Sequence, residues 1–365
     1  MDHVTPEHFD RNLHDNVQKL AEELREESYY PQAVRRCWIP KLGSQEKRPL
    51  GIPTVRDRVV QAALRDVIEP IFERDFAEHS YGFRPGRGCK DALRRVDQLL
   101  KAGYTIVVDV DLKSYFDTIP HDQLLDRIRA KISDGRVLGL IAAFLKQGVM
   151  DGLREWTPEE GSPQGAVISP LLSNIYLDPL DHLMAQRGYE MIRYADDFVI
   201  LCRSTEEAET ALQLIREWTG AAGLTLHPIK TKIVDAYRDG FDFLGYRFQH
   251  GDRYPREKSL KKLKDTIRSK TRRANGHSLE AIIHTVNLTL KGWFIYFKHV
   301  TKRYVFTTLD KWIRGRLRSI LRKRQKRRGR ARGRDHQRWP NAFFANHGLF
   351  NLEAAYVEAR QSSSR

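Results

Sequence analysis

Two groups of carboxylates stand inside apolar segments of this sequence. Asp196 and Asp197 are adjacent in "RYADDFVIL", and Asp109 and Asp111 alternate in "TIVVDVDL". Neighbouring acids repel each other, and burying either one is costly unless a cation compensates for its charge. Such oxygen ligands suit Mg²⁺, which keeps several water molecules and takes phosphate oxygens as its remaining ligands. The pattern admits two interpretations, one side of a metal site or the polar tip of an ordinary surface hairpin.

The segments around these acids predict strands. Residues 105–112 are rich in β-branched side chains, and "EMIRYADDFVILC" reads as two strands that meet at a tight turn near 195–197. Side chains alternate along a strand, so Asp109 and Asp111 share one face. If the first strand pairs with the hairpin, Asp111 and Asp196 converge. Two metal ions about 3.5–4 Å apart can activate an attacking hydroxyl and stabilise a leaving oxygen in phosphoryl transfer.

The charge of the chain is distributed unevenly. The 365 residues carry a net charge of +16, yet residues 1–250 hold 33 Lys and Arg against 39 Asp and Glu, a balance of −6. Residues 251–365 hold 30 against 8, a balance of +22. This asymmetry indicates a polyanion bound mainly by the C-terminal part. We therefore expect two domains, 1–250 and 251–365, and no membrane partner, because no apolar run reaches 18 residues.

Cysteine usage and the N-terminus indicate the compartment. Cys37, Cys89 and Cys202 lie far apart with no CxxC pair, so neither a zinc site nor a disulfide framework is predicted. The start, "MDHVTPEHFDRN", is polar and acidic, which excludes a signal peptide. We expect the protein in the reducing cytoplasm of a bacterium.

Hydrophobic periodicity predicts the remaining elements. Residues 37–53 read as two short strands around a polar turn, and 241–249 as one apolar-aromatic strand. The expected helices cover 6–27, 55–76, 89–100, 121–132, a segment within 160–184, 206–223, 259–273, 279–297 and 310–325. In the last of these helices, Trp312 falls on the apolar side and the arginines on the other.

The order of the motifs resembles a known family. The chain is similar to group II intron-encoded reverse transcriptases over roughly residues 5–355, because at least eight of their motifs occur in order at plausible spacing. The motifs are "RPLGIPTVRDRVVQ", "SYGFRPGRG", "DLKSYFD", "GSPQGAVISPLLSNIYL", "YADD", "LTLHPIKTK", "FDFLGY", "LKGWFIYF" and "RWPNAFFANHGLFNL".

This resemblance implies a fold and a reaction. The expected fold class is α+β, a right-hand polymerase whose fingers and palm contain an antiparallel palm sheet, followed by an α-helical thumb or maturase domain. By matched position, Asp111, Asp196 and Asp197 are the catalytic and metal-binding residues, with Asp196 expected to bind metal more than Asp197. The implied cofactor is Mg²⁺, two ions, with Mn²⁺ as a possible substitute. Asp109 lies outside this triad and is interpreted either as a residue that supports the metal ligands or as a structural one.

The resemblance also implies a nucleotide site. Phe116 stands where the family keeps a ring under the sugar, which would clash with a ribose 2′-hydroxyl and favour dNTP substrates; the alternative is a core aromatic. Gln164 and Gly165 belong to the "SPQG" turn. Glycine allows a close backbone approach to a nucleotide, whereas the alternative for Gln164 is a turn and helix cap.

Three cations complete that nucleotide site. Lys41 and Arg48 match the family's triphosphate-binding pair, since Arg grips phosphate with parallel hydrogen bonds and Lys supplies a point charge. Without the family, they read as solvated loop residues. Lys230 in "HPIKTK" resembles the family's lysine near the leaving pyrophosphate, where it would donate a proton. Lys232 is its local competitor.

Nucleic-acid contacts are expected in two places. Arg84 and Arg87 of "GFRPGRG" would either cradle the template backbone or form a simple basic turn. The basic C-terminal helices would bind an RNA–DNA duplex formed on the RNA template and, as in maturases, group II intron RNA. The aromatic residues of 293–297 are interpreted as core of that domain rather than as stacking platforms.

Alternatives and departures remain. The chain starts inside the family's N-terminal stretch, and nothing after 355 resembles the endonuclease region that some members carry, so we expect no second-strand cleavage. Besides an RNA-directed DNA polymerase, the sequence admits a splicing factor that mainly binds intron RNA. It also admits a host-adopted reverse transcriptase in defence or repair. The sequence indicates no oligomeric state.

Overall fold

The computed structural model describes residues 4–40, 47–151, 154–274, 276–327 and 333–362. The chain divides into two compact units, the N-terminal unit up to Ala236 and the C-terminal unit from Tyr237. This boundary lies earlier in the chain than the predicted one at 250, where the composition changes. Residues before 250 pack with the later helices: the hydroxyl of Tyr246 donates to the carbonyl of Tyr296 at 2.5 Å.

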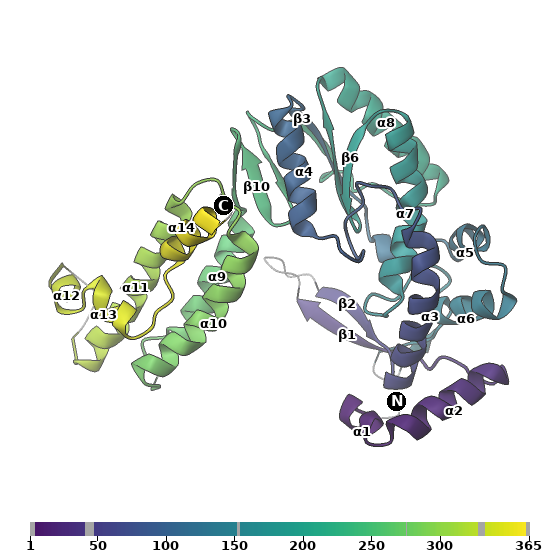
Figure 1. Cartoon of the computed structure of the whole chain (residues 1–365), viewed down its shortest axis with the longest axis horizontal. Coiled ribbons are helices and arrows are strands. Elements are labelled where there is room, and N and C mark those ends of the chain that lie inside the picture. Colours follow the sequence, from purple (N-terminus) through teal and green to yellow (C-terminus); the bar gives the residue numbers. More distant parts are fainter. Residues whose placement is uncertain (1–3, 41–46, 152–153, 275, 328–332, 363–365) are drawn as a thin grey trace. The chain divides into compact units, whose positions relative to one another are not determined.

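The N-terminal unit alternates helices and strands (Figure 1). Its helices are α1 (Pro6–Arg11), α2 (Leu13–Arg25), α3 (Val55–Glu73), α4 (Cys89–Lys101), α5 (His121–Arg129), α6 (Gly135–Leu145), α7 (Ser169–Gln186) and α8 (Thr205–Ala221). Its strands are β1 (Val34–Pro40), β2 (Lys47–Ile52), β3 (Ile106–Asp111), β4 (Val149–Asp151), β5 (Arg154–Trp156), β6 (Glu190–Tyr194), β7 (Asp197–Cys202) and β8 (Lys232–Asp235).

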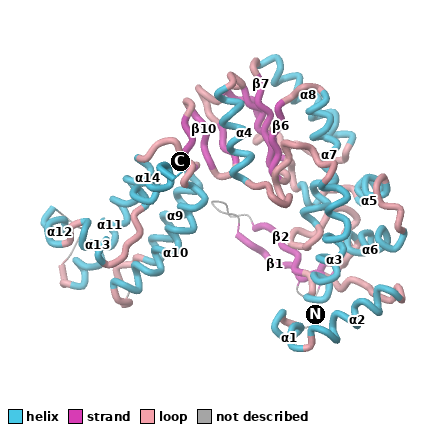
Figure 2. Tube along the Cα trace, in the orientation of Figure 1, coloured by secondary structure: helices cyan, strands magenta, loops and turns pink. Residues whose placement is uncertain are grey.

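A four-stranded antiparallel sheet is the centre of the N-terminal unit. Its strand order is β6-β7-β3-β8, with the predicted strand at 105–112 between the hairpin β6–β7 and β8. The register between β3 and β7 sets Asp111 opposite Asp197. Within the β6–β7 hairpin, Tyr194 pairs with Asp197, so the turn between the two strands has two residues. Helices α4, α7 and α8 pack against these strands (Figures 1 and 2).

The second sheet of this unit contains the predicted hairpin at 37–53. Its order is β2-β1-β4-β5, with β1 and β2 antiparallel and β1 and β4 parallel. Cys37 on β1 is exposed and lies opposite Leu50. Lys41 falls between the two strands, outside the described residues.

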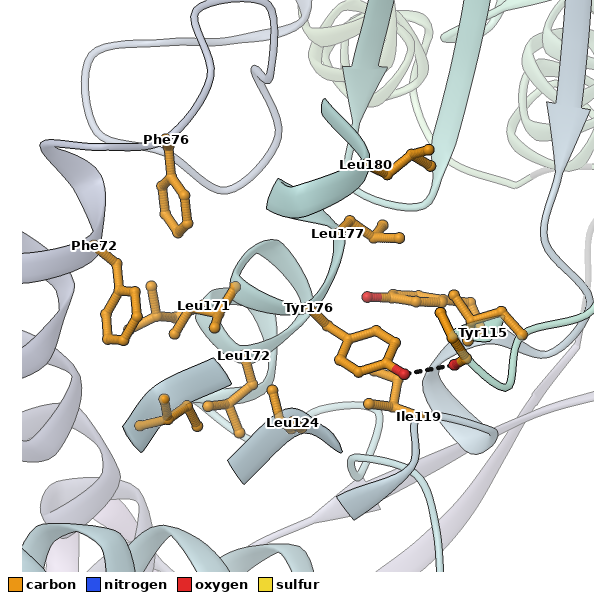
Figure 3. Packing of buried hydrophobic residues seen from close by; sticks show 14 of the residues in the cluster. Phe72, Phe76, Tyr115, Ile119, Leu124, Leu171, Leu172, Tyr176, Leu177 and Leu180 are labelled. Carbon is orange, nitrogen blue, oxygen red and sulfur yellow. Dashed lines mark hydrogen bonds between the residues drawn. The ribbon is translucent and has the colours of Figure 1, made fainter. Parts of the chain in front are cut away.

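The core below the central sheet is packed around α7 (Figure 3). Its apolar side chains include Leu171, Leu172 and Leu177, each at most 3% exposed. Two tyrosine side chains lie in this core, and the hydroxyl of each donates a hydrogen bond to a backbone carbonyl. Tyr115 donates to the carbonyl of Ser173 at 2.8 Å, and Tyr176 donates to the carbonyl of Ala222 at 2.5 Å. Burying a hydroxyl without such a partner would be costly.

The C-terminal unit is a small sheet followed by helices. Its strands are β9 (Phe241–Phe243), β10 (Tyr246–Gln249) and β11 (Asp252–Pro255). Its helices are α9 (Glu257–Lys270), α10 (Leu279–Phe297), α11 (Tyr304–Arg324), α12 (Gly333–Arg338), α13 (Asn341–Asn346) and α14 (Leu352–Ser362). The three helices predicted after residue 250 correspond to α9, α10 and α11.

The single strand predicted at 241–249 is wrong. The chain reverses at Leu244 and Gly245, whose φ angles are 47° and 80°, and β9 pairs antiparallel with β10. Left-handed backbone at two consecutive residues is typical of a tight hairpin turn. The α+β class, with an antiparallel sheet followed by a helical part, is confirmed.

Side-chain caps fix the starts of several helices. Ser278 accepts a hydrogen bond from the amide of Ala281 at 3.1 Å and begins α10. Such caps satisfy amides that have no partner inside the helix. The other side-chain caps of this kind include Thr54, Asp134 and Ser204. Within the described ranges, no helix has the length and apolar character needed to cross a bilayer.

Candidate active site

The structure brings Asp111 and Asp196 together, as the sequence predicted. Asp111 ends β3, and Asp196 lies in the turn that leads into the neighbouring strand β7. Burial raises the pKa of the Asp196 carboxyl, and the negative charge of Asp111 raises it further. The positive charges of Arg48 and Arg193 act in the opposite direction. Two acids that share one site in this way favour a bound cation.

The two-residue turn Ala195–Asp196, hereafter the Asp196 turn, has unusual backbone. Ala195 adopts a φ of 59°, a conformation that costs an L-residue about 1–2 kcal/mol. Arg193 offsets this cost, because its guanidinium donates to the carbonyl of Ala195 at 2.9 Å. The guanidinium is fully buried and also donates to Asp181 at 2.8 Å and to Asn174 at 2.9 Å. A buried network thus fixes the turn.

Gly82 supports the same turn from a distant part of the chain. Asn174 donates to the carbonyl of Gly82 at 2.8 Å, and the amide of Tyr81 donates to the carbonyl of Arg193 at 2.9 Å. A Cβ atom on Gly82 would lie 2.2 Å from the backbone nitrogen of Ala195. Position 82 therefore requires glycine for close approach. This role of Gly82, Asn174 and Arg193 was not predicted from the sequence.

Lys230 contacts one of the two converging acids. Its Nζ lies 3.2 Å from each carboxylate oxygen of Asp111. The competitor Lys232 is instead aligned with Asp109 across β8 and β3. Lys230 is thus the lysine beside the carboxylates, in agreement with the order in which the sequence ranked the two.

His227, which was not predicted from the sequence as part of the site, contacts the end of β3. Its amide donates to the carbonyl of Asp111 at 2.8 Å. Its Nδ1 faces the amides of Ile229 at 3.3 Å and Lys230 at 3.4 Å. A ring nitrogen that accepts from the backbone two residues on resembles an Asx turn. His before Pro in "LHPIK" was the available signal for such a turn.

The donor set fits a divalent metal that also takes substrate oxygens. Within the described part of the chain, no group of three or more His, Cys, Asp or Glu side chains could hold a metal. Asp111 and Asp196 offer hard carboxylate oxygens, and Asp197 is exposed beside them. Mg²⁺ is usually bound by one or two carboxylates together with waters and substrate phosphates. The residues present therefore match its needs.

A cavity of about 220 Å³ is lined by two of the predicted nucleotide-binding residues, Phe116 and Gln164. Arg36 and Trp156 also line this cavity, and the Arg36 guanidinium lies 4.7 Å from the Trp156 ring centroid. Neither was identified from the sequence, because each stands in a short strand with no motif around it. Phe116 is half-buried and packs against Tyr115, so it also serves as core.

The "SPQG" turn is docked on strand β2. The carbonyl of Gln164 accepts from the amide of Gly51 at 2.7 Å. Gly165 has a φ of 109°, and a Cβ there would lie 2.6 Å from the Gly51 carbonyl oxygen. This contact by itself requires glycine at 165. Arg48 on the same strand is exposed, and its positive charge acts on Asp196.

Arg84 differs from the expectation of a template contact. Its side chain is 2% exposed and forms a 2.7 Å ion pair with Glu73. It also donates to the carbonyls of Ala77 at 2.6 Å and Ser80 at 2.9 Å. These bonds hold the loop that carries Gly82. Arg84 therefore fits the second alternative read from the sequence, a residue that forms the turn, better than a template contact. Arg87 is half-buried and donates to the carbonyl of Glu78.

Comparisons with known proteins identify the family of the chain. The family model "Reverse transcriptase (RNA-dependent DNA polymerase)" matches residues 39–248, more than half of the chain. The model "Group II intron, maturase-specific domain" matches residues 260–339.

Three relatives illustrate the extent of the similarity. Protein YkfC of Escherichia coli is 38% identical over 63% of this chain and 70% of its own length. The group II intron-encoded protein LtrA of Lactococcus lactis is 41% identical over 47% of this chain and 28% of its own. An uncharacterized 91 kDa protein in the cob intron of Schizosaccharomyces pombe is 32% identical over 68% and 38%. The matches to the latter two span well under half of those proteins.

Proposed function

We propose, from the premise that this chain belongs to the reverse transcriptase (RNA-dependent DNA polymerase) family, that Asp111 and Asp196 bind the metals of its nucleotidyl transfer. Family membership confirms the resemblance read from the motifs and the enzyme class. The observation that carries the proposal is the convergence of Asp111 on the half-buried Asp196. The reaction is the copying of an RNA template into DNA from dNTPs.

The metal site is assigned to the carboxylates at the end of β3 and in the Asp196 turn. Reverse transcriptases generally use divalent metal ions, and we infer two Mg²⁺ ions, replaceable by Mn²⁺, held by Asp111 and Asp196 with Asp197 beside them. Such ions, when bound, activate the primer 3′-hydroxyl and neutralise the pyrophosphate. The protein contributes rigid placement of the oxygens, through the Arg193 network and the glycine at 82.

The residues around the carboxylates would orient the nucleotide. Arg48 is exposed on β2 and would grip the triphosphate, together with Lys41. Phe116 would exclude a ribose 2′-hydroxyl, and Gln164 and Gly165 would border the base and sugar. These assignments are supported by the shared cavity of Phe116 and Gln164 and by the influence of Arg48 on Asp196.

Lys230 has two consecutive tasks in this proposal. Before substrate binds, its ammonium neutralises Asp111 through the 3.2 Å contacts. Once a nucleotide is in place, the same ammonium would turn to the leaving pyrophosphate and donate a proton. Its side chain is 59% exposed, which leaves it free to change rotamer.

RNA is the proposed partner of the C-terminal unit. The excess positive charge after residue 250 and the match to a maturase-specific domain support it. Affinity of such a surface for RNA falls steeply with salt, because bound cations are released from the phosphates. We propose RNA–DNA duplex and group II intron RNA as the ligands, and a bacterial cytoplasm, which suits three unpaired cysteines.

Primer extension tests the polymerase proposal. The full chain should extend a DNA primer on an RNA template with dNTPs and Mg²⁺. Asp196→Asn should lower the rate by about a thousandfold or more, ~4 kcal/mol of barrier, while its affinity for RNA stays within about twofold because the substitution lies outside the basic C-terminal unit. Asp109→Asn is the matched control, a carboxylate on the same sheet outside the proposed metal set, and should keep most activity.

Two results would overturn the polymerase proposal. One is equal extension by Asp196→Asn and the unaltered chain. The other is no extension by the unaltered chain with either Mg²⁺ or Mn²⁺.

A splicing role is the second candidate, favoured by the match to the maturase-specific domain at 260–339. An intron RNA bound specifically near physiological salt, and spliced equally well by Asp111→Ala and the unaltered chain, would make RNA binding the primary role. Absence of RNA binding under those conditions would exclude this candidate.

A further inference from the structure

An open groove of about 620 Å³ lies within the C-terminal unit, between α9, the segment after it, α11 and α12. Its lining is basic, and no carboxylate is among the described residues that border it. The chemically distinctive members are Arg268, Thr271, Arg273, Trp312, Arg316 and His336. We call this feature the arginine groove.

Arg316 is the central cation of the arginine groove. Burial lowers its pKa, and the positive charges of Arg268 and Arg273 lower it further. It donates to the hydroxyl of Thr271 at 2.6 Å and to the carbonyl of the same residue at 2.9 Å. These oxygens are neutral, so they orient the guanidinium without cancelling its charge.

Another arginine of the C-terminal unit has its charge compensated by a buried carboxylate. Arg322 forms a 2.8 Å ion pair with Asp335, whose side chain is 1% exposed. In the arginine groove, Arg268 pairs with Asp265 at 2.6 Å, but both side chains are about half exposed and Asp265 does not line the groove. Like charges thus gather there at a cost that an anion would relieve.

Trp312 holds two of the guanidinium groups in place. Arg268 and Arg316 lie with their Cζ atoms 5.7 Å and 5.6 Å from its ring centroid. The sequence placed Trp312 on the apolar side of its helix, whereas its ring is half-buried and borders the arginine groove. Guanidinium groups fixed against an aromatic ring lose less freedom when they bind a phosphate.

Gly315 keeps the arginine groove open. It lies inside α11, where glycine is less stable than alanine. Apart from its chain neighbours and the nearby backbone of α11, no atom lies within 4 Å of the position that a Cβ on Gly315 would occupy. The space that a side chain would fill is therefore part of the groove.

We propose that the arginine groove binds a phosphate-bearing segment of RNA, with Arg268 and Arg316 donating to phosphate oxygens and Arg273 adding charge at the same site. This inference rests on the proposed RNA partner of the C-terminal unit and assigns it a specific site. The planar fork of arginine matches phosphate bidentately. A groove of about 620 Å³ has the size of a ligand pocket and exceeds the needs of a lone ion.

Filling the groove tests this inference without removing any arginine. Gly315→Glu places a side chain and a negative charge in the groove, so the affinity of the full chain for single-stranded RNA should fall at least about tenfold. The slope of log affinity against log salt should become shallower by roughly 1–2, one unit for each phosphate that the groove no longer neutralises.

Two variants control for folding and for charge. Gly292→Glu makes the same change at an exposed glycine inside α10, where nothing lies within 4 Å of the Cβ position, and should shift the affinity by less than about twofold. Gly315→Ala should keep the affinity and raise the melting temperature, since alanine favours the helix.

The outcomes separate this inference from the proposed function. If Gly315→Glu and Gly292→Glu bind RNA equally well, the groove inference is wrong, and primer extension by the unaltered chain still supports the polymerase. If the unaltered chain extends no primer, the polymerase proposal fails whatever the RNA affinities are. If polyglutamate competes for Gly315-dependent binding as well as RNA of equal charge does, the groove belongs to an acidic protein surface and the inference is overturned.

Discussion

The Asp196 turn and the arginine groove are opposite solutions to one electrostatic problem. Each gathers like charges in a half-buried place, and burial shifts each pKa toward the neutral form, upward for Asp196 and downward for Arg316. The acids have a local cation, since Lys230 contacts Asp111. The guanidinium of Arg316 instead rests on neutral oxygens of Thr271.

The two places also differ in what fixes their geometry. Asp196 is placed by backbone, through the left-handed Ala195 and the close approach of Gly82. Arg316 is placed by side-chain contacts with Thr271 and Trp312, next to a glycine that has room for a Cβ. Chemistry at a metal requires positions fixed to fractions of an ångström. Binding a flexible polyanion requires less exact positions. We therefore expect small substitutions to impair the Asp196 turn strongly and the arginine groove only weakly.

Among the variants that test this comparison, removing the local cation gives the largest expected effect. Lys230→Ala should lower kcat between about a hundredfold and a thousandfold through loss of the proton donor. The same change should lower the Mg²⁺ concentration for half-maximal activity, because Asp111 loses a competing cation. A Mg²⁺ titration of primer extension measures both quantities.

Lys232→Ala is the control for this experiment, since Lys232 is aligned with Asp109 rather than Asp111. It should leave kcat within about threefold, as expected of a surface substitution. A larger loss in Lys232→Ala than in Lys230→Ala would reverse the assignment of the two lysines.

Disturbing the backbone behind the Asp196 turn ranks next. Gly82→Ala should lower kcat by about thirtyfold to a hundredfold, because its Cβ would lie 2.2 Å from the Ala195 nitrogen and must displace the turn. The affinity for RNA should not change. Single-turnover primer extension and RNA binding measure the two effects separately.

Gly88→Ala provides the matched control in the same loop. A Cβ at Gly88 meets nothing within 4 Å, and its φ of −160° suits any residue. It should keep nearly full kcat. Equal losses in Gly82→Ala and Gly88→Ala would show that the loop as a whole, rather than the contact with Ala195, sets the rate.

The smallest effect concerns a buried acid of the basic unit. Asp310 accepts from the amides of Leu352 at 3.1 Å and Glu353 at 3.0 Å, yet burial raises its pKa above the usual 3.8. The folded state therefore holds this proton more tightly than the unfolded state. The resulting stability is present at acid pH and is lost as pH rises through the raised pKa.

Asp310→Asn removes that dependence. The melting temperature of the variant minus that of the unaltered chain should increase from about pH 4 to pH 7, by the equivalent of roughly 1 kcal/mol or less. Thermal unfolding at several pH values measures it. If the difference in melting temperature instead decreases with pH, the two amide hydrogen bonds outweigh burial and lower the pKa of Asp310. The pKa shift of Asp310 would then be opposite in direction to that of Asp196.

Local pattern predicted much of the architecture. Alternation and β-branched residues predicted β3 and the β6–β7 hairpin, and their pairing brought Asp111 to Asp196. Helical periodicity predicted α9, α10 and α11. Patterns of this kind report which face of an element is buried, which is why these predictions agree with the structure.

The turn that splits 241–249 and the turn at His227 are local features that were missed, whereas other misses depend on partners remote in sequence. Arg84 looked like a loop cation because nothing nearby marks Glu73, eleven residues earlier, as its partner. The roles of Arg193 and Gly82 arise from contact between two loops, which spacing does not reveal. Trp312 was placed on the apolar side of its helix because periodicity cannot distinguish a buried ring from one that borders a groove.

The distribution of thiols has a practical consequence. Cys202 is fully buried, and burial raises the pKa of its thiol to about 12, so it stays protonated and unreactive. Cys37 is exposed on β1 in the hairpin that carries Arg48, and Cys89 is half-buried. A maleimide dye therefore attaches first at Cys37. The hairpin therefore carries a natural position for a fluorophore, and a change in its signal on adding dNTPs would test the proposed role of Arg48.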